Sequence, residues 1–134
     1  MENNNIHTND NNINLELDKF RKILNNKINE KKNQIHPSHN KVYNNSLQQE
    51  IHCLKWVLGQ TNTTATINQG QIQMSQIEDI IQREVNNLER TLMTTKSLSI
   101  QKRDMFVIYT EILEWVLYVI RSIQEKGLHW QFNI

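Results

Sequence analysis

Apolar residues recur at intervals of three and four along most of this chain, the spacing that places side chains on one face of an α-helix. Polar segments separate four such stretches, which predict helices over residues 13–35, 40–58, 72–95 and 100–126. The chain has one Pro and three Gly in 134 residues, too few for the frequent turns of a β-sandwich. We therefore expect an all-α fold: an antiparallel three- or four-helix bundle, with coiled-coil character where the apolar face is narrow.

A few residues define the predicted helix ends. Pro37 disfavours helical geometry at the residue before it, so the first helix should end there. Gly59 and Gly127 are predicted C-terminal stops, and Ser99 is a predicted N-cap. Residues 60–71, which are uncharged and rich in Thr, are expected to form a flexible loop. The pattern leaves open whether the third and fourth helices are separate or one long rod.

The first twelve residues differ in composition from the rest. They contain six Asn and one aliphatic residue, Ile6, and so offer too little apolar surface to offset the entropy lost on ordering. We expect a disordered tail over residues 1–12 and one helical domain over residues 13–134.

Two helices offer apolar surface for a partner. The first carries a narrow seam on a basic helix, and the fourth is apolar around more than half of its circumference, which is typical of a central or self-associating helix. Large apolar residues at alternating positions follow the fourth helix. The predicted partner-binding residues are Leu17, Phe20, Leu24, Ile28, Trp130 and Phe132. The predicted core residues are Leu54, Trp56, Ile81, Leu88, Tyr109, Ile112, Trp115 and Val116.

A short motif occurs twice. Leu54-Lys-Trp-Val-Leu58 and Leu113-Glu-Trp-Val-Leu117 share a Leu-x-Trp-Val-Leu core. A duplicated helical hairpin would give this pattern, and so would chance in helical sequence rich in Leu and Val.

The charges are balanced overall but unevenly distributed. The net charge is +1, yet the segment from Lys19 to Lys41 has seven basic residues and one acid. Such a run is most often a solvated helix face. The alternative is a nucleic-acid-binding face, and a second alternative is a peripheral membrane contact. The residues of the nucleic-acid interpretation are Lys19, Arg21, Lys22, Lys27, Lys31 and Lys32.

Patterns that carry catalytic or metal chemistry are missing from the sequence. It has no glycine-rich phosphate loop, no nucleophile elbow and no pair of metal-binding Cys residues. His52 and Cys53 would point about 100° apart on a helix, which argues against a zinc site shared with His36 and His39. Glu111 and Glu114 are expected at the solvent edge of the fourth helix or paired with basic residues of the first helix. We expect no catalytic residue, metal or cofactor.

The lone Cys53 and the polar N-terminal residues favour an intracellular protein, cytoplasmic or alternatively nuclear. Cys53 is expected to be a buried thiol, because apolar residues surround it in the helix. The fourth helix is long enough to span a bilayer, but its two Glu make that costly. The sequence as a whole predicts a non-enzymatic protein–protein interaction module, or a small subunit or adaptor of a helical complex, acting as a homo-oligomer or with a protein partner.

Overall fold

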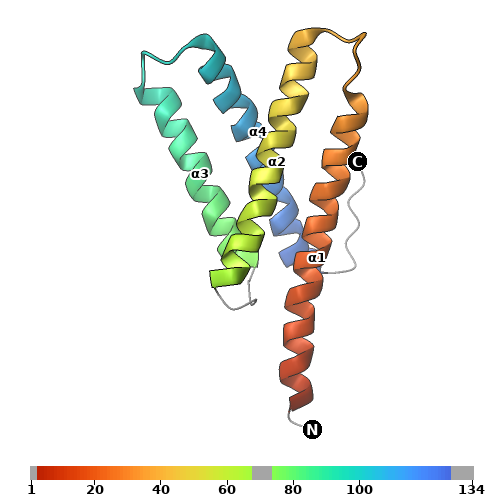
Figure 1. Cartoon of the computed structure of the whole chain (residues 1–134). Helices are drawn as coiled ribbons and strands as arrows, with labels where there is room; N and C mark the ends of the chain where they lie inside the picture. Colours follow the sequence, from red (N-terminus) through yellow and green to blue (C-terminus); the bar gives the residue numbers. More distant parts are fainter. Residues whose placement is uncertain (1–2, 68–73, 128–134) are drawn as a thin grey trace.

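The structure, a computed structural model, describes the backbone over residues 3–67 and 74–127 and the side chains over residues 15–62 and 74–127. It contains four helices: α1 (Asn3–Gln34), α2 (Lys41–Ile67), α3 (Met74–Thr94) and α4 (Ile100–Lys126). Successive helices run in opposite directions (Figure 1). The described residues include no strand, so the prediction of an all-α antiparallel bundle is confirmed.

The turn between α3 and α4 makes them separate helices. Ser99 caps α4, because its Oγ accepts a hydrogen bond of 3.2 Å from the backbone N–H of Lys102. Arg103 holds the turn by donating to the carbonyl oxygens of Leu92 and Thr95, each at 3.3 Å. Gly127 ends α4 with a φ of 73°, a conformation that favours glycine. The predicted cap and stop of this helix are both confirmed.

Two helices extend beyond the ranges predicted for them. α1 begins at Asn3, within the segment expected to be a disordered tail. Adding residues to an existing helix forms one hydrogen bond for each residue fixed, so a packed helix can extend beyond its apolar seam. α2 passes through Gly59 to Ile67, so residues 60–67 are helical and not part of a loop. Residues 68–71 of the expected loop lie outside the described residues.

A tertiary contact explains the extension of α2. Arg21 of α1 donates from Nε to Thr61 Oγ1 at 3.1 Å and from Nη2 to Asn62 Oδ1 at 3.0 Å. Thr61 is fully buried, and its hydroxyl also donates to the carbonyl oxygen of Leu58 at 2.6 Å. Because these bonds require helical geometry beyond Gly59, packing overrides the local preference of glycine to end a helix.

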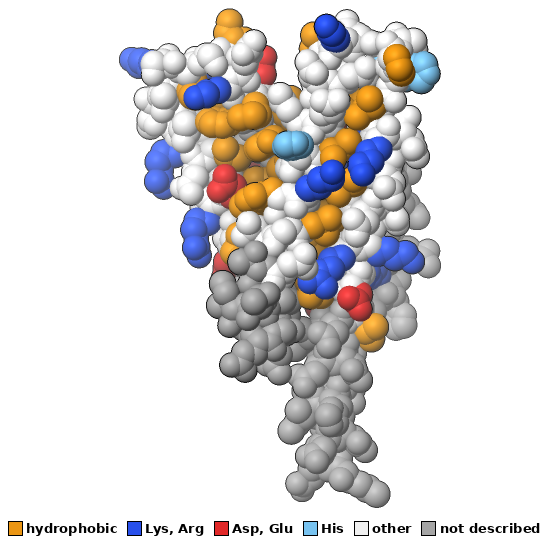
Figure 2. All heavy atoms as spheres, in the orientation of Figure 1, with side chains coloured by type: hydrophobic (Ala, Val, Ile, Leu, Met, Phe, Trp, Pro, Cys, Tyr) orange, Lys and Arg blue, Asp and Glu red, His pale blue; other side chains and the backbone are white. Residues whose placement is uncertain are grey.

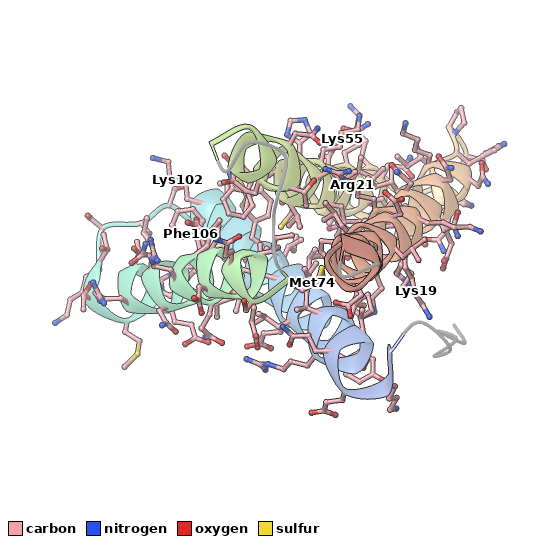
Figure 3. The ribbon with its side chains drawn as sticks, turned by 90° about the horizontal axis from the view of Figure 1, so that it is seen from below. Lys19, Arg21, Lys55, Met74, Lys102 and Phe106 are labelled. Carbon is pink, nitrogen blue, oxygen red and sulfur yellow. The ribbon has the colours of Figure 1, made fainter. Side chains whose placement is uncertain are left out.

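The bundle consists of two hairpins, α1–α2 and α3–α4. They pack mainly through α2 and α4, whereas α1 and α3 lie on opposite flanks and touch least (Figure 1). The hairpins converge at the end where α2 and α4 finish and diverge at the end where these helices begin. Seen from the converging end, Met74 points into the centre of the bundle (Figure 3).

The core follows α4, which is central as its apolar circumference predicted. Its buried residues all lie between Ile112 and Ile123, in the converging part of the bundle. Of the predicted core residues, Leu54, Ile81, Leu88, Ile112 and Val116 are buried, and Tyr109 and Trp115 are partly buried against the core. Trp56 is 38% exposed, so its prediction as a core residue is wrong. Leu54 and Val57 occupy the face of α2 that is fully buried, so the indole of Trp56 lies on the outer side of the helix.

The two hairpins share one pattern of buried positions. Four buried residues of α1 recur in α3, each 57 residues later: Leu17, Phe20, Leu24 and Ile28 match Met74, Ile77, Ile81 and Val85. Four buried residues of α2 recur in α4, each 59 residues later: Cys53, Leu54, Val57 and Thr61 match Ile112, Leu113, Val116 and Ile120. Both second helices have 27 residues, with their ends in the same register. The Leu-x-Trp-Val-Leu segments therefore occupy equivalent positions in two equivalent hairpins.

Candidate functional site

A groove lies where the two hairpins diverge. Residues of α2 and α4 line its cleft, and Glu84 of α3 joins them in lining the pocket beside it. On this side, hydrophobic side chains gather along the hollow between the hairpins (Figure 2). Phe106 and Lys102 project from the side of α4 that lies between α2 and α3 (Figure 3). No side chain of α4 before Ile112 is fully buried, so this half of the helix leaves apolar surface accessible.

The outer part of the groove is a cleft of about 220 Å³. One wall is polar and the other is mainly apolar; its lining residues are Asn45, Gln48, Gln49, His52, Met105 and Tyr109. Gln49 Oε1 is buried without a hydrogen-bond partner. A buried acceptor of this kind gains stability when a donor reaches it. The α2 wall can therefore donate to and accept from the backbone of a segment lying in the cleft.

The inner part of the groove is a pocket of about 110 Å³ that shares Tyr109 with the cleft. Its lining residues are Cys53, Trp56, Glu84, Tyr109 and Leu113. Two aromatic rings and one carboxylate thus surround an apolar floor. Glu84, on α3, is the one charged residue of this lining.

Electrostatics keep the ionisable floor of the pocket neutral. Burial, and then the nearby charge of Glu84, raises the pKa of Cys53 from 9.0 to about 12. Burial, and then the proximity of Cys53, raises the pKa of Tyr109. Cys53 is a buried free thiol, as predicted, and its raised pKa disfavours the thiolate that nucleophilic chemistry requires.

The predicted partner seam of α1 does not lie on the surface. Leu17, Phe20, Leu24 and Ile28 are all buried in the core, because α1 packs them against α2 and α4. Their assignment to a partner interface is therefore corrected to packing within the chain. The other two predicted partner-binding residues, Trp130 and Phe132, lie outside the described residues.

Several cations of the basic segment bind within the chain. Lys31 pairs with Glu50 of α2 at 2.8 Å, and Arg21 donates to Thr61 and Asn62. Lys27 lies 3.7 Å from Glu30, with its Nζ 5.4 Å from the centre of the Trp115 ring. Lys19 also makes an interaction, and Lys22 and Lys32 are exposed. Nucleic-acid binding stays a prediction, and half of its six residues now have a role inside the bundle.

The His and acidic residues singled out in the sequence are spread over the molecule. His36 and His39 lie in the α1–α2 turn with ring centres 5.5 Å apart, whereas His52 lines the cleft. Glu111 and Glu114 are exposed, at the solvent edge expected for them. Among the described residues, no group of three or more His, Cys, Asp or Glu is placed to hold a metal ion.

The part of the chain that the structure describes holds no helix long and apolar enough to cross a membrane.

Most of the groove residues were missed from the sequence. Tyr109 and Trp56 were assigned to the core, and the polar residues of α2 carried no motif. One sequence signal could have indicated the groove, namely more apolar residues in α4 than its neighbours can cover. The first half of α4 is as apolar as the second, yet three neighbouring helices cannot cover both halves once the hairpins diverge.

No protein-family model matches the chain, and no curated protein or solved structure matches it. The chain is an all-α four-helix bundle with a cleft beside the first half of α4.

Proposed function

We propose that this protein is a non-enzymatic interaction module that holds a segment of a protein partner in the groove between its two hairpins. The proposal rests on the neighbouring cleft and pocket, which α2 and α4 line together with Glu84 of α3 and which share Tyr109. The segment presents apolar side chains, because Met105, Tyr109, Trp56 and Leu113 give the lining most of its exposed surface.

The chemistry of the lining supports binding to protein. Trp and Tyr side chains in pockets supply much of the energy of protein interfaces, and Trp56 and Tyr109 both line this one. The amide side chains of Asn45, Gln48 and Gln49 can satisfy the backbone of a bound segment. A groove with apolar anchors beside polar backbone partners is a common way to bind peptides.

The titratable groups favour binding over catalysis. The two lining residues whose pKa departs from the ordinary value, Cys53 and Tyr109, both shift towards their protonated forms. Neither shift activates a nucleophile or brings a base near neutral pH.

Selection from a displayed random-peptide library tests this function. The groove is blocked by Tyr109→Arg, and Val107→Arg is the matched control because it places the same charge on the opposite face of α4, at a residue that is already exposed. We expect enriched peptides to bind the wild type and Val107→Arg alike, and to bind Tyr109→Arg at least tenfold more weakly.

A second blocking variant, Met105→Arg, guards against a folding defect in the first. Met105 lines the cleft but not the pocket. Circular dichroism checks that each variant is folded. Failure to enrich any peptide, or equal binding by both folded blocking variants and the wild type, would remove the groove as the functional site.

A further inference from the structure

We propose that the pocket between Trp56 and Glu84 is a receptor for the basic side chain, Lys or Arg, of the protein partner. This inference rests on the proposed function and names the feature of the partner that the groove selects. Its basis is the pairing of one carboxylate with two aromatic rings over an apolar floor.

The protein contains the occupied counterpart of this pocket. Trp115 of α4 matches Trp56 of α2 in the repeated motif, and Lys27 of α1 lies 57 residues before Glu84 of α3, the spacing of the buried positions. Lys27 Nζ lies 5.4 Å from the centre of the Trp115 ring. A cation from the chain itself thus lies over one tryptophan, whereas an anion lies beside the other.

The carboxylate of Glu84 is available to pair with a cation from another molecule. Among the residues that the structure describes, no Lys or Arg forms an ion pair with Glu84. Its carboxylate is partly shielded from water, and its charge reaches the pocket floor, where it contributes to the raised pKa of Cys53. A cation entering the pocket would meet both this carboxylate and two aromatic side chains.

The shape of the pocket suits a long basic side chain. Its volume is about 110 Å³, and Leu113 and Cys53 form an apolar floor against which methylene groups can pack. Tyr109 lines both the pocket and the amide-lined cleft, so the backbone of the same partner has a place to lie next to the pocket. A side chain of a bound protein segment is therefore a better occupant than an isolated small amine.

Titration with blocked amino acids tests the pocket directly. The probes are N-acetyl-lysine N-methylamide, the corresponding arginine compound and the neutral norleucine compound. The readout is the NMR shift of the Trp56 indole N–H, assigned with Trp56→Phe, with the Trp115 indole as internal reference. We expect saturable binding of the lysine or the arginine probe in the millimolar range and at least tenfold weaker binding of norleucine.

Glu84→Gln is the decisive variant, and Glu89→Gln on the exposed side of α3 is its matched control. We expect Glu84→Gln to weaken the basic probes about tenfold and Glu89→Gln to leave them unchanged. Equal binding of norleucine, or no effect of Glu84→Gln, would overturn this inference.

The two proposals fail separately. Library peptides that bind the groove equally well with and without basic residues would leave the proposed function standing and overturn the receptor for a basic side chain. Specific binding of the basic probes without any groove-binding peptide would overturn the proposed function, and with it the protein source of the basic group.

Discussion

The two hairpins share a pattern of buried positions, here called the packing frame. They differ in the charged residue that lies beside the tryptophan of each. Four buried residues of the first helix and four of the second fall at matching positions in both hairpins. The indole of Trp115, however, has Lys27 over its ring, whereas that of Trp56 lines a pocket with Glu84. Trp115 thus contacts a cation of its own chain, whereas the pocket beside Trp56 is the one that we propose takes a cation from a partner.

The two hairpins also lie close together at one end of the bundle and apart at the other. The buried residues of α4 lie in the half where the hairpins converge, and the cleft lies beside the half where they diverge. Burial of apolar surface supplies most of the favourable free energy of folding, so the converging half of α4 contributes more to stability than its diverging half. Because Met105 and Tyr109 of the cleft are only partly buried, we expect substitutions there to cost the fold little.

Truncation of equivalent core residues gives the largest expected effect. Leu54 and Leu113 occupy matching positions and are buried almost completely. Leu54→Ala and Leu113→Ala should each lower the free energy of unfolding by about 3 kcal/mol, the usual cost of such a cavity. Urea denaturation measures both. If one variant lost less than half as much as the other, the two hairpins would not share a packing frame.

The next largest expected effect is on the pH dependence of stability, through Cys53 at one of the matched buried positions. Cys53 matches Ile112, and the folded state raises the pKa of Cys53 from 9.0 to about 12. The folded protein therefore retains a proton that the unfolded chain releases. The resulting stability is complete below pH 9 and is lost as the pH rises towards 12, by at most about 1.4 kcal/mol per pH unit.

Denaturation of variants between pH 8 and 10.5 checks this sign. Cys53→Ala should lose stability less steeply with rising pH than the wild type, although Tyr109, whose pKa is also raised, keeps part of the slope. Ile112→Ala is the matched control, because it makes a cavity at the equivalent position and leaves the thiol in place. If the stability of Cys53→Ala fell with rising pH as steeply as that of the wild type, the pH dependence would not come from the Cys53 thiol.

The hairpins also explain which sequence predictions succeed. Apolar periodicity predicts α3 and α4 within two residues at each end, because their amphipathic pattern and their caps at Ser99 and Gly127 agree. It fails at Gly59, since Arg21 and Thr61 extend α2 through a contact between residues far apart in the chain. It misplaces Trp56 because periodicity assigns a residue to an apolar face but cannot show whether a neighbouring helix covers that face.

Gly59 gives the smallest effect and the sharpest test of the shared frame. It matches Tyr118, an exposed residue within α4, and an added Cβ at Gly59 would meet nothing within 4 Å. Alanine is a better helix former than glycine, so Gly59→Ala should raise the free energy of unfolding by about 0.5–1 kcal/mol. Thermal and urea denaturation would both show the gain.

Gly127→Ala is the matched control for that substitution. Gly127 also has open space around it, but its φ of 73° is strained for any residue with a Cβ, so this variant should be less stable than the wild type. Opposite signs for the two glycines would place Gly59 inside a helix and Gly127 at the end of one. A loss of stability in Gly59→Ala as well would mean that α2 stops at Gly59, and α2 would then no longer match α4 in length.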